Sequence, residues 1–323
     1  MWQRGTSFSS VASGTYQADR WRTEYDIYGG AVRTVTRQTF TAGQTAVPGN
    51  PKYYLQYAQT VAGSGGTYQN EIAQSVESVL TLAGQVATLS MWIQATVGTP
   101  PISVTIGQIF GTGGSSTVYI NLPTYTLTPN WQQYVWTFQV PSISGKTVGT
   151  TGDDYFGIFV RTNSVIVKTL NFASVQLEAG PVATPFEVRP YGVELQLCQR
   201  YYQEMPNTNG GHFTGAARLL GATNATSGTN VLSSLYLTIP MRAAPTPTYY
   251  GNGSATGNYN INTSSSGSSV GTSVAATSTG TSTTAGNMIA PNLPAITATG
   301  GSVQWVDMGW GTNNLGITLN AEL

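Results

Sequence analysis

The stretch VQLEAGPVATPFEVRPYGVELQLCQRYY, residues Val175 to Tyr202, indicates where one β domain ends and another unit begins. At its start Val175 and Leu177 alternate with polar residues, which is the period-two pattern of a strand with one buried face. A Gly-Pro pair then ends the strand, and two more prolines keep the following backbone extended. From Val193 onward the apolar residues recur at helical spacing, so we expect a short helix there.

The same alternation predicts a series of strands before this stretch. Strand-forming patterns cover residues 53–58, 68–76, 86–95, 102–110, 131–140, 155–161 and 165–178. Turns rich in Gly, Pro and Asn separate them, and no long helical pattern intervenes. The loop from Gly111 to Ser116 is predicted to be a hairpin connection and not a phosphate loop, because no helix signal follows it. Strands at short, regular spacing indicate a β sandwich.

The first 50 residues are predicted to be loop-rich, with one β hairpin arm around Val32, Val35 and Phe40. This is the most charged part of the chain, and we interpret its charges as a solvated or contact-making edge. At the other end, residues 250–287 are mostly Gly, Ser, Thr, Ala and Asn. Composition alone is compatible with disorder there. The aromatic, β-forming sequence of residues 304–323 favours short hairpins whose apolar side chains are buried against neighbouring copies, so a homotrimer is predicted.

Composition limits the possible functions. The 323 residues are 40% hydrophobic and 11% aromatic, enough to fill real cores, but only 8% are charged, against about 25% in ordinary proteins. Thirteen basic and thirteen acidic residues cancel, so no field attracts nucleic acid or an anionic membrane surface. No window approaches about 18 uninterrupted apolar residues, so no membrane insertion is predicted.

The search for catalytic chemistry nominates no residue. One His and one Cys cannot fill a tetrahedral zinc site or form an internal disulfide. The Gly-Ser-Ser-Val-Gly run at 267–271 lacks the strand-then-helix context of a nucleophile elbow. Glycoside hydrolysis needs two facing carboxyl groups, and only Asp19 with Glu71 or Glu77 is left open as a pair. We therefore predict no enzyme and no cofactor, with Asp153 and Asp154 as weak calcium candidates against the alternative of a solvated turn.

Saccharide binding fits the residue types better. Aromatic faces stack on sugar rings, and neutral amides and hydroxyls match sugar hydroxyls; the chain has seven Trp and eighteen Tyr. Trp92 lies on the polar side of its predicted strand, and Tyr68, Gln74 and Gln94 are predicted to share a sheet face or rim with it. These four residues are the candidate carbohydrate contacts. The alternative is that Trp92 simply packs in the sandwich core or under a loop, as large aromatics usually do.

Several motifs resemble those of bacteriophage tail-fibre and virion-appendage proteins. Besides the opening stretch they are WQRGTSF (Trp2–Phe8), ADRW (Ala18–Trp21), LAGQVATLSMWIQA (Leu82–Ala95), IFGTGGSS (Ile109–Ser116), WQQYVWTFQVPS (Trp131–Ser142), IPMRAAPT (Ile239–Thr246) and AEL (Ala321–Leu323). They occur in the order found in that family and span nearly the whole chain.

The resemblance implies an all-β fold: a carbohydrate-binding-module-like jelly roll over residues 1–185, a connector and short helix over 186–202, and a smaller antiparallel β domain over 203–323. It implies a virion structural protein, made in the cytoplasm of the bacterial host and exposed on the mature particle of tail or head. Its partners would be further copies of itself, other virion proteins and host surface polysaccharide. Two alternatives stay open: an architectural protein without glycan binding, and, less favoured, a secreted polysaccharide-degrading enzyme.

Overall fold

The computed structural model describes residues 1–25, 30–63, 69–163, 165–206, 235–236, 239–243, 245–250, 258–263, 272–275, 281–282, 288–291, 303–307 and 316–323. The chain divides into two compact units, Met1–Pro190 with Leu323, and Tyr191–Glu322. It is all-β, with a jelly-roll sandwich followed by a smaller antiparallel β unit. No helix in the described part is long and apolar enough to cross a membrane.

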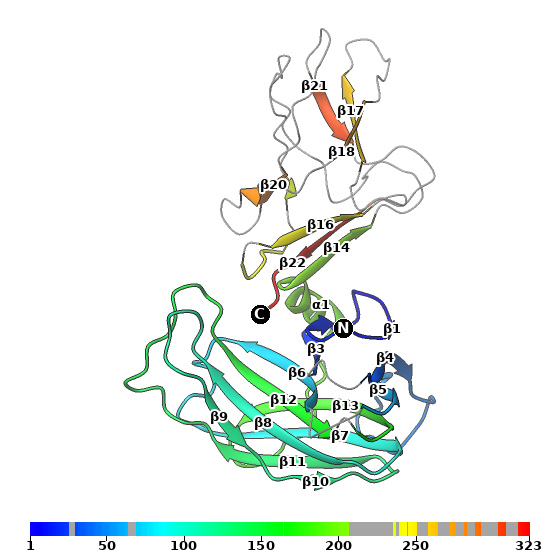
Figure 1. The fold of residues 1–323 in the computed structure, drawn as a ribbon, viewed down its shortest axis with the longest axis vertical. Helices are drawn as coiled ribbons and strands as arrows, with labels where there is room; N and C mark the ends of the chain where they lie inside the picture. The colour runs from blue at the N-terminus through cyan, green and yellow to red at the C-terminus, as the bar shows by residue number, and fades with distance from the viewer. Residues whose placement is uncertain are drawn as a thin grey trace. The chain divides into compact units, whose positions relative to one another are not determined.

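The first unit is a sandwich of two antiparallel sheets (Figure 1). Sheet A has the strand order β1-β4-β5-β13-β7-β11. Its strands are β1 (Ser7–Ser9), β4 (Val32–Thr39), β5 (Tyr53–Val61), β13 (Lys168–Ala179), β7 (Val86–Val97) and β11 (Gln132–Gln139). The last strand of the unit, β13, pairs with both β5 and β7, so contacts between distant parts of the chain hold this sheet together.

Sheet B has the order β10-β8-β12-β6-β3-β2, and β9 pairs with β8. Its strands are β10 (Tyr125–Thr126), β8 (Pro101–Ile109), β12 (Tyr155–Asn163), β6 (Gln69–Glu77), β3 (Trp21–Tyr25), β2 (Thr15–Tyr16) and β9 (Val118–Asn121). Because β8 and β9 pair antiparallel, the predicted hairpin connection over Gly111 to Ser116 is confirmed.

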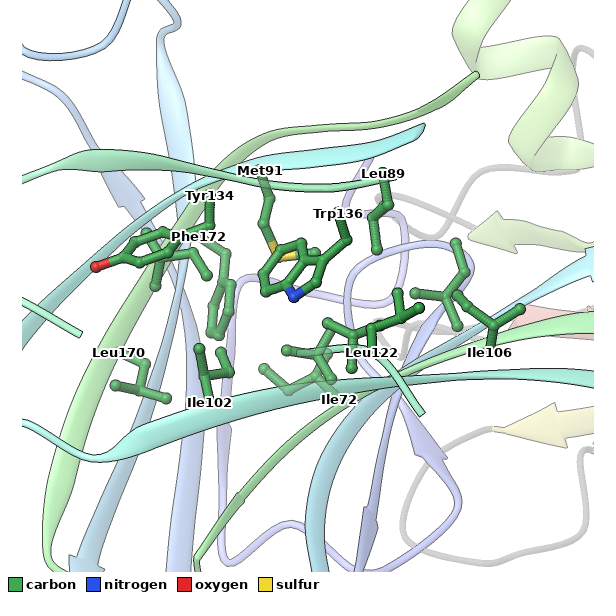
Figure 2. Packing of buried hydrophobic residues seen from close by; sticks show 14 of the residues in the cluster. Ile72, Leu89, Met91, Ile102, Ile106, Leu122, Tyr134, Trp136, Leu170 and Phe172 are labelled. Carbon is green, nitrogen blue, oxygen red and sulfur yellow. The ribbon is translucent and has the colours of Figure 1, made fainter. Parts of the chain in front are cut away.

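The core lies between the inward faces of the two sheets (Figure 2). On β7 Leu89, Met91 and Ile93 are fully buried, as the alternation predicts. Trp136 on β11 is 2% exposed, and its indole N–H donates to the Pro123 carbonyl at 2.8 Å, so the largest core side chain has its polar atom satisfied.

The first 50 residues contain the predicted hairpin arm, as β4 paired antiparallel with β5, but several of their charges are buried and do not form a solvated edge. Four strands, β1 to β4, come from the first 50 residues. Asp19, Arg22 and Arg33 are 4%, 6% and 3% exposed. The Asp19 carboxylate lies 3.5 Å from Nη1 of Arg4 and accepts from the Gln3 amide at 3.3 Å. Burial raises the pKa of Asp19, and the Met1 amine and Arg4 oppose that rise. Asp19 and Arg22 are buried beside opposite charges, Arg4 and Glu24. Arg33 instead donates to the Ala31 carbonyl at 3.0 Å, and its guanidinium carbon lies 3.7 Å from the Tyr25 ring centroid.

The second unit opens with helix α1 (Tyr191–Gln199), in which Cys198 is buried, as expected of a small apolar residue. Tyr202 was predicted to lie on the helix but begins strand β14 instead. The other described strands are β14 (Tyr202–Pro206), β15 (Leu235–Tyr236), β16 (Thr246–Tyr250), β17 (Asn258–Thr263), β18 (Thr272–Ala275), β19 (Thr281–Ser282), β20 (Met288–Pro291), β21 (Val303–Asp307) and β22 (Gly316–Asn320). They pair antiparallel, as β14-β22-β16, β15-β20-β19 and β18-β17-β21. The homotrimer stays a prediction.

Candidate functional site

The outward face of sheet B brings polar, charged and aromatic side chains together. Side chains alternate along β8 and β12: Ile106 and Ile158 point into the core, so Thr105, Phe159 and Arg161 lie on the opposite face. Strand pairing places Thr105 beside Phe159 on β12 and beside Asn121 on β9. Residues far apart in sequence therefore meet on one surface.

An open groove of about 530 Å³ runs over this surface. It is lined by Pro101, Ser103, Val104, Thr105, Asn121, Leu122, Thr124, Arg161, Thr162 and Asn163. A hydrogen-bond chain orders its polar side chains: Arg161 Nη1 donates to Thr105 Oγ1 at 3.1 Å, and Thr105 Oγ1 donates to Asn121 Oδ1 at 2.8 Å. These hydrogen bonds turn the Asn121 side-chain oxygen toward Thr105. The side-chain nitrogen of Asn121 then points the opposite way.

Two aromatic rings lie next to this groove. Phe159 and Tyr119 pack edge-to-face, with ring centroids 6.4 Å apart at 62°, an arrangement that aromatic quadrupoles favour. Tyr119 is 58% exposed. A Cβ at Gly157 would lie 2.6 Å from Cε2 of Phe159, so the glycine is required for that ring to lie against the sheet. The guanidinium carbon of Arg161 lies 5.6 Å from the Phe159 ring centroid, within the range of a cation–π contact.

A buried arginine lies on the same face. Arg22 on β3 donates from Nη1 to Ser75 Oγ at 2.7 Å and to Tyr16 Oη at 3.1 Å, and it pairs with Glu24. Burial acts to lower the pKa of Arg22, but Tyr16 and Glu24 outweigh it and raise that pKa above its usual value. Burial also raises the pKa of Tyr155. The arginine is thus a fixed charge within a hydrogen-bonded cluster.

The structure does not bring the four predicted carbohydrate contacts together. Trp92 and Gln94 lie on β7, on the outward face of sheet A. Gln74 lies on β6 in sheet B and pairs with Trp21 and Ile158, so it faces the space between the sheets. Tyr68 lies outside the described residues. The three described members of the group therefore lie on two different sheets.

The two calcium candidates anchor different loops. The Asp153 carboxylate accepts from the Thr112 amide at 2.9 Å and the Thr112 hydroxyl at 2.6 Å. These bonds and one from Thr151 hold the pKa of Asp153 well below its usual range. Asp154 instead accepts from the Val79 amide at 2.9 Å. Within the described ranges no three His, Cys, Asp or Glu residues gather as metal ligands would.

Sequence reasoning missed the groove residues Thr105, Asn121 and Arg161 and the neighbouring ring of Tyr119. It found strands β8 and β12 but not which strands are neighbours in the sheet. One sequence signal could have pointed to this face. In YFGIFVR, Gly157 lies two residues before Phe159, and a glycine inside a strand often marks the close approach of another group.

Comparison of the sequence with protein-family models and with curated proteins gives no match. Solved structures similar to this chain include the enzymatically active domain of bacteriophage CBA120 tailspike protein 4, with 17% identity, a TM-score of 0.35, and coverage of 53% of this chain and 21% of that chain. The match thus spans about a fifth of the tailspike chain.

Two other similar structures are of different kinds. The CBM22-1 xylan-binding domain of Paenibacillus barcinonensis Xyn10C has 18% identity and a TM-score of 0.33, covering 55% of this chain and 94% of its own. A cyclase from Fischerella sp. TAU has 14% identity and a TM-score of 0.33, covering 55% and 90%.

Proposed function

We propose that the chain is a non-catalytic adhesion component of a bacteriophage appendage, and that the groove on sheet B binds saccharide. The observation that carries the proposal is the groove itself, where ordered neutral and cationic donors lie beside the exposed ring of Tyr119. Binding sites of this kind combine an apolar surface with a few fixed polar groups. The virion assignment is supported by the sequence motifs that resemble appendage proteins.

In the proposed complex, the ring of Tyr119 stacks on the C–H face of a sugar residue. The Asn121 amide and the N–H groups of Arg161 donate to sugar hydroxyls, and the bond between Arg161 and Thr105 fixes their direction before the saccharide arrives. Pre-ordering of this kind lowers the entropy lost on binding. Each site is weak, and several copies on one appendage would gain strength by avidity.

We expect Asn121→Ala to weaken saccharide binding about tenfold, because one hydrogen bond to a sugar is worth about 1 to 1.5 kcal/mol. Asn121 is exposed, so the fold should be unaffected. The measurement is binding of the full chain to a bacterial glycan array, followed by calorimetry with the best array saccharide and a thermal melt of each variant.

The matched control is Gln85→Ala, which removes another exposed amide side chain, just before β7 and outside the groove lining. It should bind like the unmodified chain. If both variants bind equally, the groove is not the site. If the unmodified chain retains no saccharide at all, the architectural alternative is favoured.

A further inference from the structure

The outward face of sheet A differs from the groove in its charge. Its outward side chains include Ser7, Ser9, Thr34, Thr36, Gln38, Tyr54, Gln56, Ala58, Thr169, Asn171, Ala173, Gln176, Glu178, Val86, Thr88, Ser90, Trp92, Gln94, Gln133, Val135, Thr137 and Gln139. Thr88, Ser90 and Asn171 are buried, and Thr88 donates to the Gly180 carbonyl at 2.7 Å. Among these described side chains only Glu178 is charged. Its carboxylate accepts from the amide and hydroxyl of Thr184 at 2.9 and 2.6 Å. By contrast, the face of sheet B carries Arg22, Glu24 and Arg161.

A row of amides crosses the neutral face from β5 to β7. Gln56 Nε2 donates to Asn171 Oδ1 at 3.1 Å, and Asn171 Nδ2 donates to Gln94 Oε1 at 2.9 Å. Gln94 Nε2 in turn donates to the Pro129 carbonyl at 2.9 Å. Each amide in this row is held in one orientation by its neighbours. Asn171 itself is buried, at 2% exposed, so the row presents the partly exposed amides of Gln56 and Gln94 in fixed orientations.

Four aromatic side chains lie at this face. Phe40, Tyr54 and Trp131 form a cluster with ring centroids 4.7 to 5.4 Å apart, and all three are partly exposed. Trp92 is also partly exposed; it pairs with exposed Gln133 on β11 and with Ala173 on β13. The indole is thus flanked by an amide on one side and a methyl group on the other.

We propose that this face, centred on Trp92 and Trp131, is a second saccharide-contact surface that takes a neutral polysaccharide. Rigid aromatic rings and fixed amides match the C–H faces and hydroxyls of neutral sugars. None of these outward strand side chains is cationic. At the edge of the face the Glu187 amide donates to Gln176 at 2.8 Å, and the carboxylate of Glu187 is paired with Arg189. The face therefore offers little to attract a uronic acid, a phosphate or a nucleic acid. A surface that binds another protein would be expected to have charged side chains at its polar rim.

This surface would act independently of the groove, because the two lie on opposite outer faces of one sandwich. One chain could then contact two polysaccharide segments, or hold one branched chain at two points. Two linked weak contacts raise the effective concentration at the second site, so adhesion would strengthen without any change in either site.

The test uses the indole N–H signals of the ¹⁵N-labelled full chain in NMR, one for each of its seven tryptophans. The probes are neutral hexasaccharides with glucose, xylose or galactose backbones. We expect at least one probe to shift the Trp92 and Trp131 signals. The Trp136 indole, which donates to Pro123 inside the core, should not move. Tyr119 ring signals report the groove in the same samples.

The double variant Trp92→Ala with Gln133→Ala should lower the affinity measured at Trp131 at least tenfold and leave the shifts of Tyr119 unchanged. Shifts at Tyr119 alone would overturn this proposal and leave the groove intact. Shifts at Trp92 and Trp131 alone would support it and count against the groove. No shift at either face with any probe would overturn both.

Discussion

Trp136→Ala is expected to lower the free energy of unfolding of the sandwich by about 3 to 5 kcal/mol, as large-to-small changes in aromatic core positions do. Trp136 is 2% exposed and its ring centroid lies 5.2 Å from that of Tyr125 and 6.4 Å from that of Tyr134. Truncation would leave a cavity between the sheets and remove the hydrogen bond to the Pro123 carbonyl.

Urea unfolding followed by circular dichroism measures this loss. Gln133→Ala is the matched control, because Gln133 is exposed on the same strand and exposed substitutions usually stay within about 0.5 kcal/mol. A loss below about 1 kcal/mol for Trp136→Ala would show that the inward face of β11 is not part of the core.

The second large expected effect is a dependence of stability on pH, and it arises from Lys168, a fully buried residue on β13. Its Nζ donates to Gln59 Oε1 at 3.0 Å, to the Ile166 carbonyl at 3.4 Å and to the Asn163 carbonyl. Burial, and to a lesser degree the charge of Arg33, lower the pKa of Lys168 from 10.5 to about 7. The carbonyl oxygens favour the ammonium and work against that shift.

Between these two pKa values the folded chain binds fewer protons than the unfolded chain. The free energy of unfolding should therefore rise with pH from about 7, by up to about 3 kcal/mol at pH 9.5. Above pH 10 the trend should reverse, because burial raises the pKa of Tyr57 to about 12, and a tyrosine protonated only in the folded state costs stability as pH rises further.

Urea unfolding at a series of pH values across a window of about three units, from about 6.5 to about 9.5, gives the dependence of stability on pH directly. Lys168→Met keeps the side-chain stem and should flatten the curve, while Lys146→Met, at an exposed position, should retain it. A flat curve in the unmodified chain would show that the carbonyl oxygens keep Lys168 charged throughout.

The fold could be predicted from sequence because its strands alternate so regularly. Val86–Val97 and Gln132–Gln139 read as half-buried strands and form them, since a strand with one buried face has period two wherever it lies. Strands β1 and β2 were missed because they have 3 and 2 residues, too few for a period to emerge.

The candidate sites could not be predicted in the same way. Which residues meet on a sheet face depends on strand order, and β12 pairs with both β6 and β8 across long stretches of sequence. For Gln74 the sequence did contain a signal. Ile72 and Val76 lie two residues before and after it and pack at the core, so the alternation along the strand already indicated that Gln74 faces inward.

The central claim, that the sandwich holds saccharide without cleaving it, is tested most directly by gel filtration of the full chain with capsular or cell-wall polysaccharide from a susceptible bacterial host. The account predicts that protein co-elutes with polysaccharide and that the polysaccharide keeps its size after prolonged incubation. Shortened polysaccharide would reveal an enzyme, and protein eluting entirely apart from every polysaccharide tried would contradict saccharide binding.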